Sequence, residues 1–286
     1  MASRIVDPQA RSAPAASTLT ESNYRFLQDY IYRESGIVID ADKHYLLETR
    51  LLPLARQCDI GSLNALCDAL RGHRPALRQK VIDAITTNET LWFREPAQFD
   101  ALRQHILPEL IAARAAERRL SIWSAAASSG QELYSVAMTL LDVSLTGWNL
   151  RLLGTDLSLQ ILERAVRGRY LQLEVNRGLP AQYLVKYFRR VGLDWQLNDE
   201  VRRMCEFRQF DLRSSAASLG KFDIVFCRNV LIYFDHITKT KILNEIARTL
   251  YPGGYLFLGT AETILNLQVP FERLTIGPTV VYRAPS

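Results

Sequence analysis

The 286-residue chain carries 35 basic and 30 acidic residues, and 48% of its residues are hydrophobic. This composition is typical of a globular protein with a large core, and the modest net charge of +5 argues against a nucleic-acid partner. No run approaches the ~18 apolar residues of a membrane span, so we expect no membrane insertion and a cytoplasmic protein. The cysteines show no CxxC spacing, which predicts reduced thiols and neither a zinc site nor a disulfide framework.

The first 85 residues predict a tail and a helical module. Residues 1–19 are rich in alanine, serine and proline without periodicity, which predicts a disordered tail. Hydrophobic spacing then predicts four helices, the first running from a cap at Thr20 or Ser22 to Gly36, and the others at about 42–57, 61–71 and 75–85. We expect an N-terminal helical domain at 20–85, followed at 86–118 by a linker and a connecting helix.

Beyond residue 118 short apolar runs alternate with helical segments. Strands are predicted at 120–126, 150–156, 205–211, 222–229 and 254–260, with helices at 131–142, 158–166 and 235–250. This alternation predicts a parallel sheet covered by helices on both faces. Two further strands near the C-terminus can pair through a hairpin at Gly277 and Pro278. The polar stretch 168–204 is too long for a simple connection and predicts a small inserted subdomain.

The first strand ends in WSAAASSGQELYS (123–135), where hardly a side chain between Trp123 and Glu132 exceeds serine in size. Such a turn at the carboxyl end of a parallel strand lets the backbone approach a ligand, although small residues also make a tightly packed turn. Asp156 ends the second strand, where a carboxylate accepts the ribose hydroxyls of a nucleotide. Turns that bind a pyrophosphate read G-x-G-x-x-G, but this turn has only Gly130. The carboxylate of Glu132 would also repel a phosphate. These features predict a ligand with adenosine and no phosphate, which S-adenosylmethionine satisfies.

Four segments resemble, in order and spacing, the chemotaxis receptor methyltransferase family of the CheR type: TTNETLWFRE (86–95), WSAAASSGQELYS, GTDLS (154–158) and FCRNVLIYFD (226–235). The resemblance covers nearly everything from residue 20 onward. It implies an α/β fold, namely a Rossmann-like, seven-stranded methyltransferase domain at 119–286 with an inserted antiparallel β subdomain at about 170–205. The family's turn usually reads closer to STGEEPYS, so Gln131 replaces the first acidic residue while Glu132 is kept.

The resemblance also implies an activity. The chain would be an S-adenosylmethionine-dependent protein-glutamate O-methyltransferase that forms methyl esters on the cytoplasmic helices of chemoreceptors, in chemotaxis signal transduction. S-adenosylhomocysteine would be the product, and no metal is expected. A methyltransferase of another signalling protein or of a small acid, and a regulatory module that binds S-adenosylhomocysteine without turnover, remain as alternatives.

Site residues follow from the resemblance position by position. Arg94 and Tyr233 would be catalytic, since a guanidinium captures a carboxylate and Tyr233 would shape the approach of the glutamate. Asp211 replaces a usual asparagine and keeps an acceptor for the adenine amino group. Arg94 as a solvated side chain and Tyr233 as a core aromatic stay open, whereas Trp92 and Phe93 are expected to be packing residues. The predicted cofactor-binding residues are Asn88, Thr90, Arg94, Glu132, Asp156, Asp211, Leu212, Asn229 and Val230.

Recognition of the receptor is predicted from two further stretches. Lys43, Arg50 and Arg56 lie on a segment that resembles the family's basic receptor-facing helix, although a merely solvated helix face is the alternative and Pro53 interrupts the segment. The stretch 187–207 is compact and contains one glycine, Gly192, so we expect recognition without a receptor pentapeptide added to a strand edge. We expect the chain to be a monomer.

Overall fold

The computed structural model describes residues 19–72 and 74–285, which form two compact units. One unit holds the described residues up to Tyr30 together with Ile39–Ile85, and the other holds Ile31–Val38 and the chain from Thr86 onward. The structure thus differs from a simple division at residue 85, because Ile31–Val38 belongs with the larger unit. The tail predicted at 1–19 lies outside the described residues except for Leu19, which is buried. Across the described chain, no helix is both long and apolar enough to cross a membrane.

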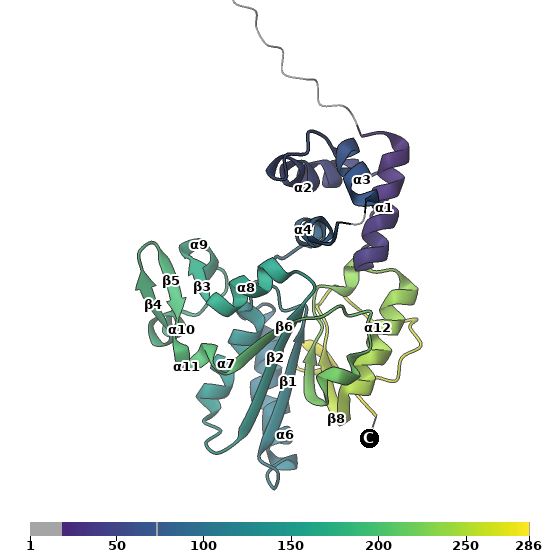
Figure 1. Cartoon of the computed structure of the whole chain (residues 1–286). Helices are drawn as coiled ribbons and strands as arrows, with labels where there is room; N and C mark the ends of the chain where they lie inside the picture. The colour runs from purple at the N-terminus through teal and green to yellow at the C-terminus, as the bar shows by residue number, and fades with distance from the viewer. Residues whose placement is uncertain (1–18, 73, 286) are drawn as a thin grey trace, which may run out of the picture. The chain divides into compact units, whose positions relative to one another are not determined.

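The smaller unit is built from four helices, as predicted (Figure 1). Thr20 caps the first helix, because its Oγ1 accepts a hydrogen bond from the backbone N–H of Asn23. Pro53 lies inside the second helix without ending it. The buried side chains of the unit include Leu27, Leu47, Leu51 and Leu66. The helices are α1 (Glu21–Ser35, of which the last turn belongs to the larger unit), α2 (His44–Gln57), α3 (Leu63–Arg71) and α4 (Pro75–Ile85).

The larger unit contains the predicted seven-stranded sheet, in the order β6-β2-β1-β7-β8-β10-β9. The first five of these strands are parallel, and β10 runs antiparallel to both β8 and β9. The chain leaves β1 towards β2 and β6 on one side and returns to β7 on the other, so the strand order reverses beside β1. The strands are β1 (Arg119–Ala125), β2 (Asn149–Asp156), β6 (Cys205–Gln209), β7 (Phe222–Phe226), β8 (Leu250–Phe257), β9 (Glu272–Ile276) and β10 (Thr279–Arg283).

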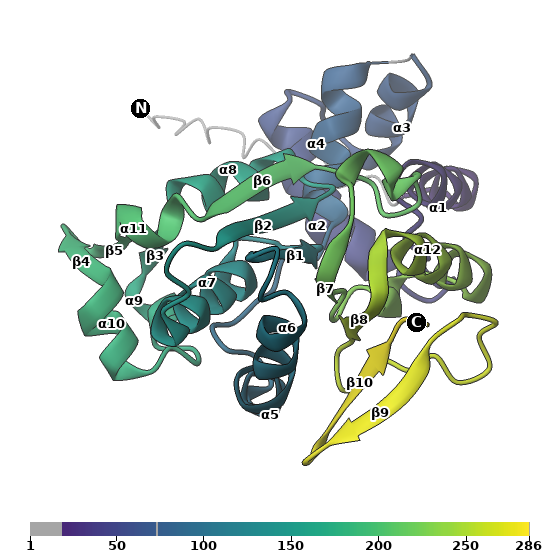
Figure 2. The ribbon, with the colours of Figure 1, turned by 90° about the horizontal axis from the view of Figure 1, so that it is seen from below.

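Helices cover both faces of this sheet (Figure 2). Successive side chains of a strand point to opposite faces of the sheet, which divides the core in two. Ile122 and Ile224 pack on one face with the helices that precede and follow β1, whereas Trp123 and Val225 pack on the other face with α12. The predicted alternation of strands and helices is therefore confirmed. The helices are α5 (Pro96–Ala101), the π-helix η1 (Leu102–Ile106), α6 (Leu107–Ala113), α7 (Gln131–Val143), α8 (Leu159–Arg167) and α12 (His236–Thr249).

The predicted inserted subdomain lies between α8 and β6 and contains a three-stranded antiparallel sheet, in the order β3-β5-β4. Tyr170 ties it to the β1–α7 turn, because its buried hydroxyl donates a 2.8 Å hydrogen bond to the carbonyl of Ser129. Tyr183 and Lys186 hold Asp142 of α7. Its elements are β3 (Arg169–Leu171), α9 (Gln172–Val175), α10 (Ala181–Tyr187), β4 (Phe188–Val191), β5 (Asp194–Leu197) and α11 (Asp199–Arg202).

Candidate cofactor and active site

The small residues of the β1–α7 turn serve two purposes. Ala126 and Ser128 line a cavity and hold left-handed backbone conformations, with φ of 70° and 51°. Gly130 (φ 91°) faces the protein instead, since a Cβ there would lie 3.0–3.1 Å from Tyr134, Ala165 and Phe207. The packing interpretation therefore holds at Gly130, whereas Ala126 and Ser128 leave the cavity side of the turn free of large side chains. Left-handed non-glycine residues cost free energy and tend to collect at functional sites.

Asp156, at the end of β2, fixes the shape of this turn. Its Oδ2 accepts a 2.9 Å hydrogen bond from the backbone N–H of Ser128, and its Oδ1 accepts one of 3.0 Å from Ser158. The residue is 8% exposed and lines the cavity. The Asp156 carboxylate thus holds the turn at the edge of the cavity.

Glu132, in the first turn of α7, belongs to a buried ionic network. Its Oε1 accepts a 2.7 Å hydrogen bond from Ser124 Oγ, and its Oε2 lies 2.9 Å from Nη1 of Arg228. Arg228 also pairs with Glu95 at 3.1 Å. The Arg228 side chain is 1% exposed, lines the cavity, and has an Nε without a hydrogen-bond partner within the described chain. Sequence analysis missed Arg228, although an arginine directly after a buried strand is itself unusual.

The first residues of the larger unit after α4 include three predicted site residues, Asn88, Thr90 and Arg94, and all three line the cavity. Ser128 Oγ donates a 2.8 Å hydrogen bond to the Asn88 carbonyl, which joins this segment to the turn. The Arg94 guanidinium makes one long contact, 3.5 Å to the Glu89 carbonyl, and has no ion pair with a carboxylate of the described residues. It is therefore available to an anion.

Trp92 and Phe93 are packing residues, as expected. Trp92 is fully buried and packs edge-on against Tyr170 and Phe188 of the inserted subdomain. Phe93 stacks on Tyr183 with ring centroids 5.1 Å apart. The two aromatic residues attach the segment that carries Arg94 to the subdomain.

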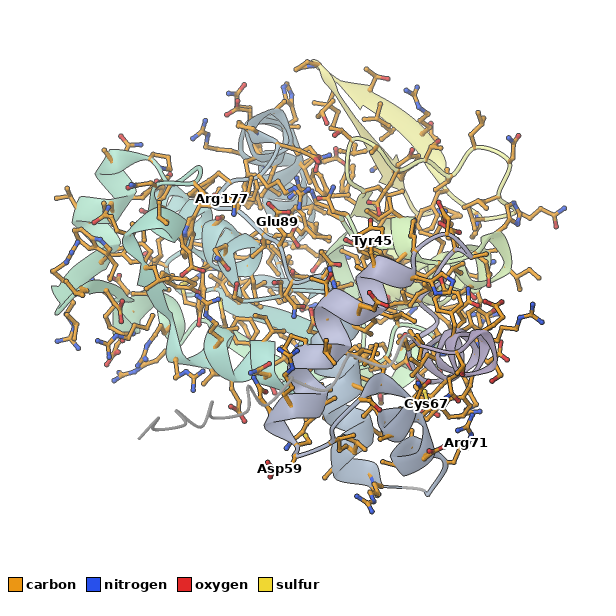
Figure 3. The ribbon with its side chains drawn as sticks, turned by 90° about the horizontal axis from the view of Figure 1, so that it is seen from above. Tyr45, Asp59, Cys67, Arg71, Glu89 and Arg177 are labelled. Atoms are coloured by element: carbon orange, nitrogen blue, oxygen red, sulfur yellow. The ribbon has the colours of Figure 1, made fainter. Side chains whose placement is uncertain are left out.

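A second link between this segment and the subdomain is ionic. Figure 3 shows Glu89 beside Arg177, and the carboxylate lies 2.5 Å from the guanidinium. Arg177 holds the pKa of Glu89 below its usual range. The backbone N–H of Trp92 also donates to the carbonyl of Arg177 at 3.2 Å. The turn that follows α9 is thereby fixed to the segment around Arg94.

The loop after β7 presents Asn229 and Val230 to the same cavity. Asn229 is left-handed, with φ of 57°. Tyr233 ends the short 3-10 helix η3 (Leu231–Tyr233) and also lines the cavity. Its hydroxyl has no hydrogen-bond partner among the residues that the structure describes, so it can donate to a ligand or a substrate.

Asp211 and Leu212 line the cavity beyond β6, and Asp211 is also the partner of an arginine. Its carboxylate binds the Arg213 guanidinium, at 2.6 Å from Nη2 and 3.0 Å from Nε. An adenine amino group would share these oxygens with Arg213. Through its other donors Arg213 also binds the last carbonyls of α1, those of Tyr32, Arg33 and Glu34.

The end of α1 contributes cavity residues that sequence analysis missed. Ser35 and Ile37, within the part of the larger unit formed by Ile31–Val38, line the cavity. The backbone N–H of Val38 donates a 3.0 Å hydrogen bond to the Tyr233 carbonyl, and the Tyr32 hydroxyl donates to Asp235 at 2.6 Å. Only folding brings these residues together, because about 200 positions separate them.

All predicted catalytic and cofactor-binding residues line this one cavity, which holds about 900 Å³ of empty space including its mouth. S-adenosylmethionine fits the residues present. Apolar side chains, among them Leu157 and Phe210, suit an adenine ring, while the Asp156 carboxylate suits ribose hydroxyls. Within the described part of the chain, the Nε of Arg228 has no hydrogen-bond partner and Arg94 has no carboxylate partner, so both suit a polar, carboxylate-bearing end. Among the described residues, no cluster of three or more histidine, cysteine, aspartate or glutamate side chains could hold a metal ion. All four cysteines are free thiols.

Two family models match the chain. One, described as the SAM-binding domain of CheR methyltransferase, matches residues 88–279, and the other, the all-alpha domain of CheR methyltransferase, matches residues 22–86.

Curated relatives match along most of their length. Chemotaxis protein methyltransferase 1 of Pseudomonas aeruginosa is 43% identical over 92% of this chain and 98% of its own. The chemotaxis protein methyltransferase of Vibrio parahaemolyticus is 40% identical over 94% and 98%, and that of Escherichia coli 32% over 92% and 91%. Among solved structures, magnesium protoporphyrin IX methyltransferase of Synechocystis PCC 6803 aligns with a TM-score of 0.34 at 18% identity, over 70% of this chain and 87% of that one.

Proposed function

Because the chain belongs to the CheR methyltransferase family, whose S-adenosylmethionine-binding domain it contains, we propose that it methylates glutamates of chemoreceptors. The product would be a glutamyl methyl ester on the receptor's cytoplasmic helices. The observation that carries the proposal is the cavity at the carboxyl ends of β1, β2 and β7, lined by the residues that match the family's motifs. Relatives at 40–43% identity are named chemotaxis protein methyltransferases, which supports the choice of acceptor.

We assign the cofactor's parts to groups in the cavity. Asp156 would accept the two ribose hydroxyls, and Leu212 and Val230 would flank the adenine. Asn88, Thr90, Glu132 and Asn229 would bind the remaining polar groups, and Asp211 would meet the adenine edge while it holds Arg213. The methionine end would lie towards Glu132 and Arg228, where an ammonium group finds a carboxylate and a carboxylate finds a guanidinium.

When bound, S-adenosylmethionine supplies a methyl group on a positively charged sulfur. The glutamate side chain is ionised at neutral pH, since its ordinary pKa is about 4.3. Its oxygen forms the new bond to the methyl carbon while the carbon–sulfur bond breaks, so no proton is transferred and no general base is needed. The residues of the chain therefore align the reactants and exclude water, effects that can supply roughly 7–11 kcal/mol.

Two side chains would orient the accepting carboxylate. Arg94 carries a guanidinium without a carboxylate partner in the described residues, which favours bidentate capture of an anion. Tyr233, at the end of η3, contributes a hydroxyl that has no hydrogen-bond partner among the described residues. We propose that Arg94 draws the carboxylate into the cavity and that Tyr233 directs one oxygen towards the methyl group.

Receptor docking would involve the basic residues of the smaller unit, most of all Arg56. Lys43 pairs with Asp40, and Arg50 donates a 2.6 Å hydrogen bond to the carbonyl of Ile85, so both have structural roles. Arg56 is exposed. We further propose a cytoplasmic monomer that needs no pentapeptide tether. The turn between β4 and β5 supports this, because it consists only of Gly192 and Leu193. A turn this short does not extend the hairpin into a loop along which a peptide could bind.

Incubation of the purified protein with radiolabelled S-adenosylmethionine and receptor-containing membranes tests the proposal. We expect label on a receptor that is released as methanol by mild base, because carboxylate methyl esters hydrolyse there and methylated amines do not. Label on another protein would reject the acceptor. Cofactor binding without any transfer would identify a regulatory module instead.

A further inference from the structure

A carboxylate that sequence analysis did not single out lies behind the loop that follows β7. Glu262 follows β8 in the chain and is absent from the cavity lining. Its Oε2 accepts hydrogen bonds of 2.7 Å from the backbone N–H groups of Asn229 and Gly259. Its Oε1 accepts bonds of 2.9 Å from Val230 and 2.7 Å from Leu231. Four backbone donors thus fill the four acceptor positions of one carboxylate.

Three of these donors belong to the backbone that shapes the site. Asn229 is left-handed (φ 57°), which a side-chain-bearing residue rarely adopts without support. Leu231 begins η3, and the first N–H groups of a helix lack partners within it. Asn229 and Val230 line the cavity, and Tyr233 ends the same short helix. The group that holds these N–H donors therefore sets the direction of all three cavity residues.

We propose that Glu262 is a positioning residue for methyl transfer, whose carboxylate holds the Asn229–Leu231 backbone so that the loop meets the cofactor and Tyr233 meets the accepting carboxylate. The part that concerns Tyr233 rests on the proposed function. The part that concerns cofactor binding does not, because it requires only that Asn229 and Val230 line the cofactor cavity.

The surroundings of Glu262 are built for a carboxylate. An amide in its place would offer one oxygen and an NH₂ group, so two of the four backbone donors would face another donor. Gly259 permits the close approach, since a Cβ there would lie 2.5 Å from Asn229 Nδ2 and 2.9 Å from Glu262 Oε2. Burial raises the pKa of Glu262, and the four hydrogen bonds oppose that shift.

The variant Glu262→Gln tests the proposal because it keeps the size of the side chain. We expect its dissociation constant for S-adenosylhomocysteine, measured by titration calorimetry, to rise at least tenfold, and its kcat on receptor membranes at saturating cofactor to fall at least tenfold. Glu245→Gln is the matched control. Glu245 also accepts a hydrogen bond from a backbone N–H, that of Ala216 at 3.2 Å. Like Glu262, it does not line the cavity. Both constants of the control should stay within twofold of wild type.

Hydrogen exchange gives a second measurement, which needs no acceptor and no turnover. In the wild-type protein the amides of Asn229, Val230 and Leu231 should exchange at least 100-fold more slowly than unprotected amides, and this protection should fall in Glu262→Gln while that of β8 persists. Amides that exchange at unprotected rates in wild type, or a Glu262→Gln protein whose cofactor affinity and kcat both stay within twofold, would overturn the inference. Exchange rates and affinity for S-adenosylhomocysteine do not depend on which acceptor is methylated, so a failure in them is distinct from a failure of the proposed function. Only the kcat on receptor membranes rests on that function.

Discussion

At the scale of single residues, Asp156 has a structural role, to which our proposal adds a binding role. Its two oxygens hold the N–H groups of Ser128 and Ser158, and the same oxygens face the cavity where a ribose would lie. A residue with both roles orients the ligand accurately, because the turn and the ligand share one anchor. Its removal therefore affects binding through direct contacts and through the turn.

Asp156→Ala should weaken the binding of S-adenosylhomocysteine. Each lost hydrogen bond to a charged group costs about 1.5–3 kcal/mol, which is tenfold or more in affinity. Titration calorimetry measures the change. Ser158→Ala is the control, because Ser158 caps the start of α8 at the same strand end without lining the cavity. An Asp156→Ala protein with wild-type affinity would show that the ribose lies elsewhere.

Which site residues the sequence could predict depends on how they reach the cavity. Asp156, Glu132 and Asn229 follow strands or open a helix, so the rule that ligands bind at the carboxyl ends of parallel strands finds them. Ser35 and Glu262 reach the site by tertiary contacts alone, and no local pattern distinguishes them. Asp211 lines the cavity, but its salt bridge with Arg213 was not predicted, because the spacing of two residues does not by itself indicate an ion pair.

At the scale of elements, the segment 86–95 depends on the inserted subdomain for its shape. Phe93 and Glu95 are left-handed on either side of Arg94, with φ of 46° and 60°. Such residues persist where neighbouring contacts hold them. Here the contacts come from Arg177 and Gly178, which follow α9. A Cβ on Gly178 would lie 2.1 Å from the Trp92 carbonyl oxygen, so the two backbones touch.

Gly178→Ala should therefore displace Trp92 and, with it, Arg94. We expect a loss of unfolding free energy of about 1–3 kcal/mol, from the left-handed conformation (φ 89°) and the clash, together with a larger fall in methylation rate than in cofactor affinity. Gly192→Ala is the matched control, because Gly192 is also left-handed (φ 63°) but has no atom within 4 Å of an added Cβ. Denaturant unfolding and initial rates measure both. Equal effects of the two substitutions would show that the contact with Trp92 is unimportant.

The elements themselves were largely predictable because their signals are local. Apolar runs of strand length, helix caps and the Gly277–Pro278 turn all act within a few residues, and the structure has the corresponding strands and hairpin. The assignment of Ile31–Val38 was not predictable in this way. The first of those residues belong to the last turn of α1, and tertiary contacts, among them those with Arg213, Tyr233 and Asp235, attach the stretch to the larger unit.

At the scale of the whole molecule, the proposed docking of a receptor depends on the net charge and on which basic side chains are free to bind it. The net charge of +5 is small, and many basic side chains are paired, as Lys43 is with Asp40. Arg50 is better left intact in any test, since its hydrogen bond to Ile85 satisfies the last carbonyl of α4. Of the three basic residues considered for docking, the exposed Arg56 is the one whose charge can be changed without loss of such a contact.

Arg56→Glu should slow methylation of receptor membranes at low salt and leave cofactor affinity unchanged. The screening length falls from about 10 Å at 0.1 M salt to about 3 Å at 1 M, so the wild-type rate should decline with salt and approach that of the variant. Arg203→Glu, on the exposed end of the inserted subdomain, changes the net charge equally and is the control. Initial rates across a salt series measure both variants, with and without a C-terminal receptor pentapeptide as competitor. If Arg203→Glu were the slower enzyme, or if the peptide inhibited at micromolar concentration, the subdomain rather than the α2 helix would hold the receptor.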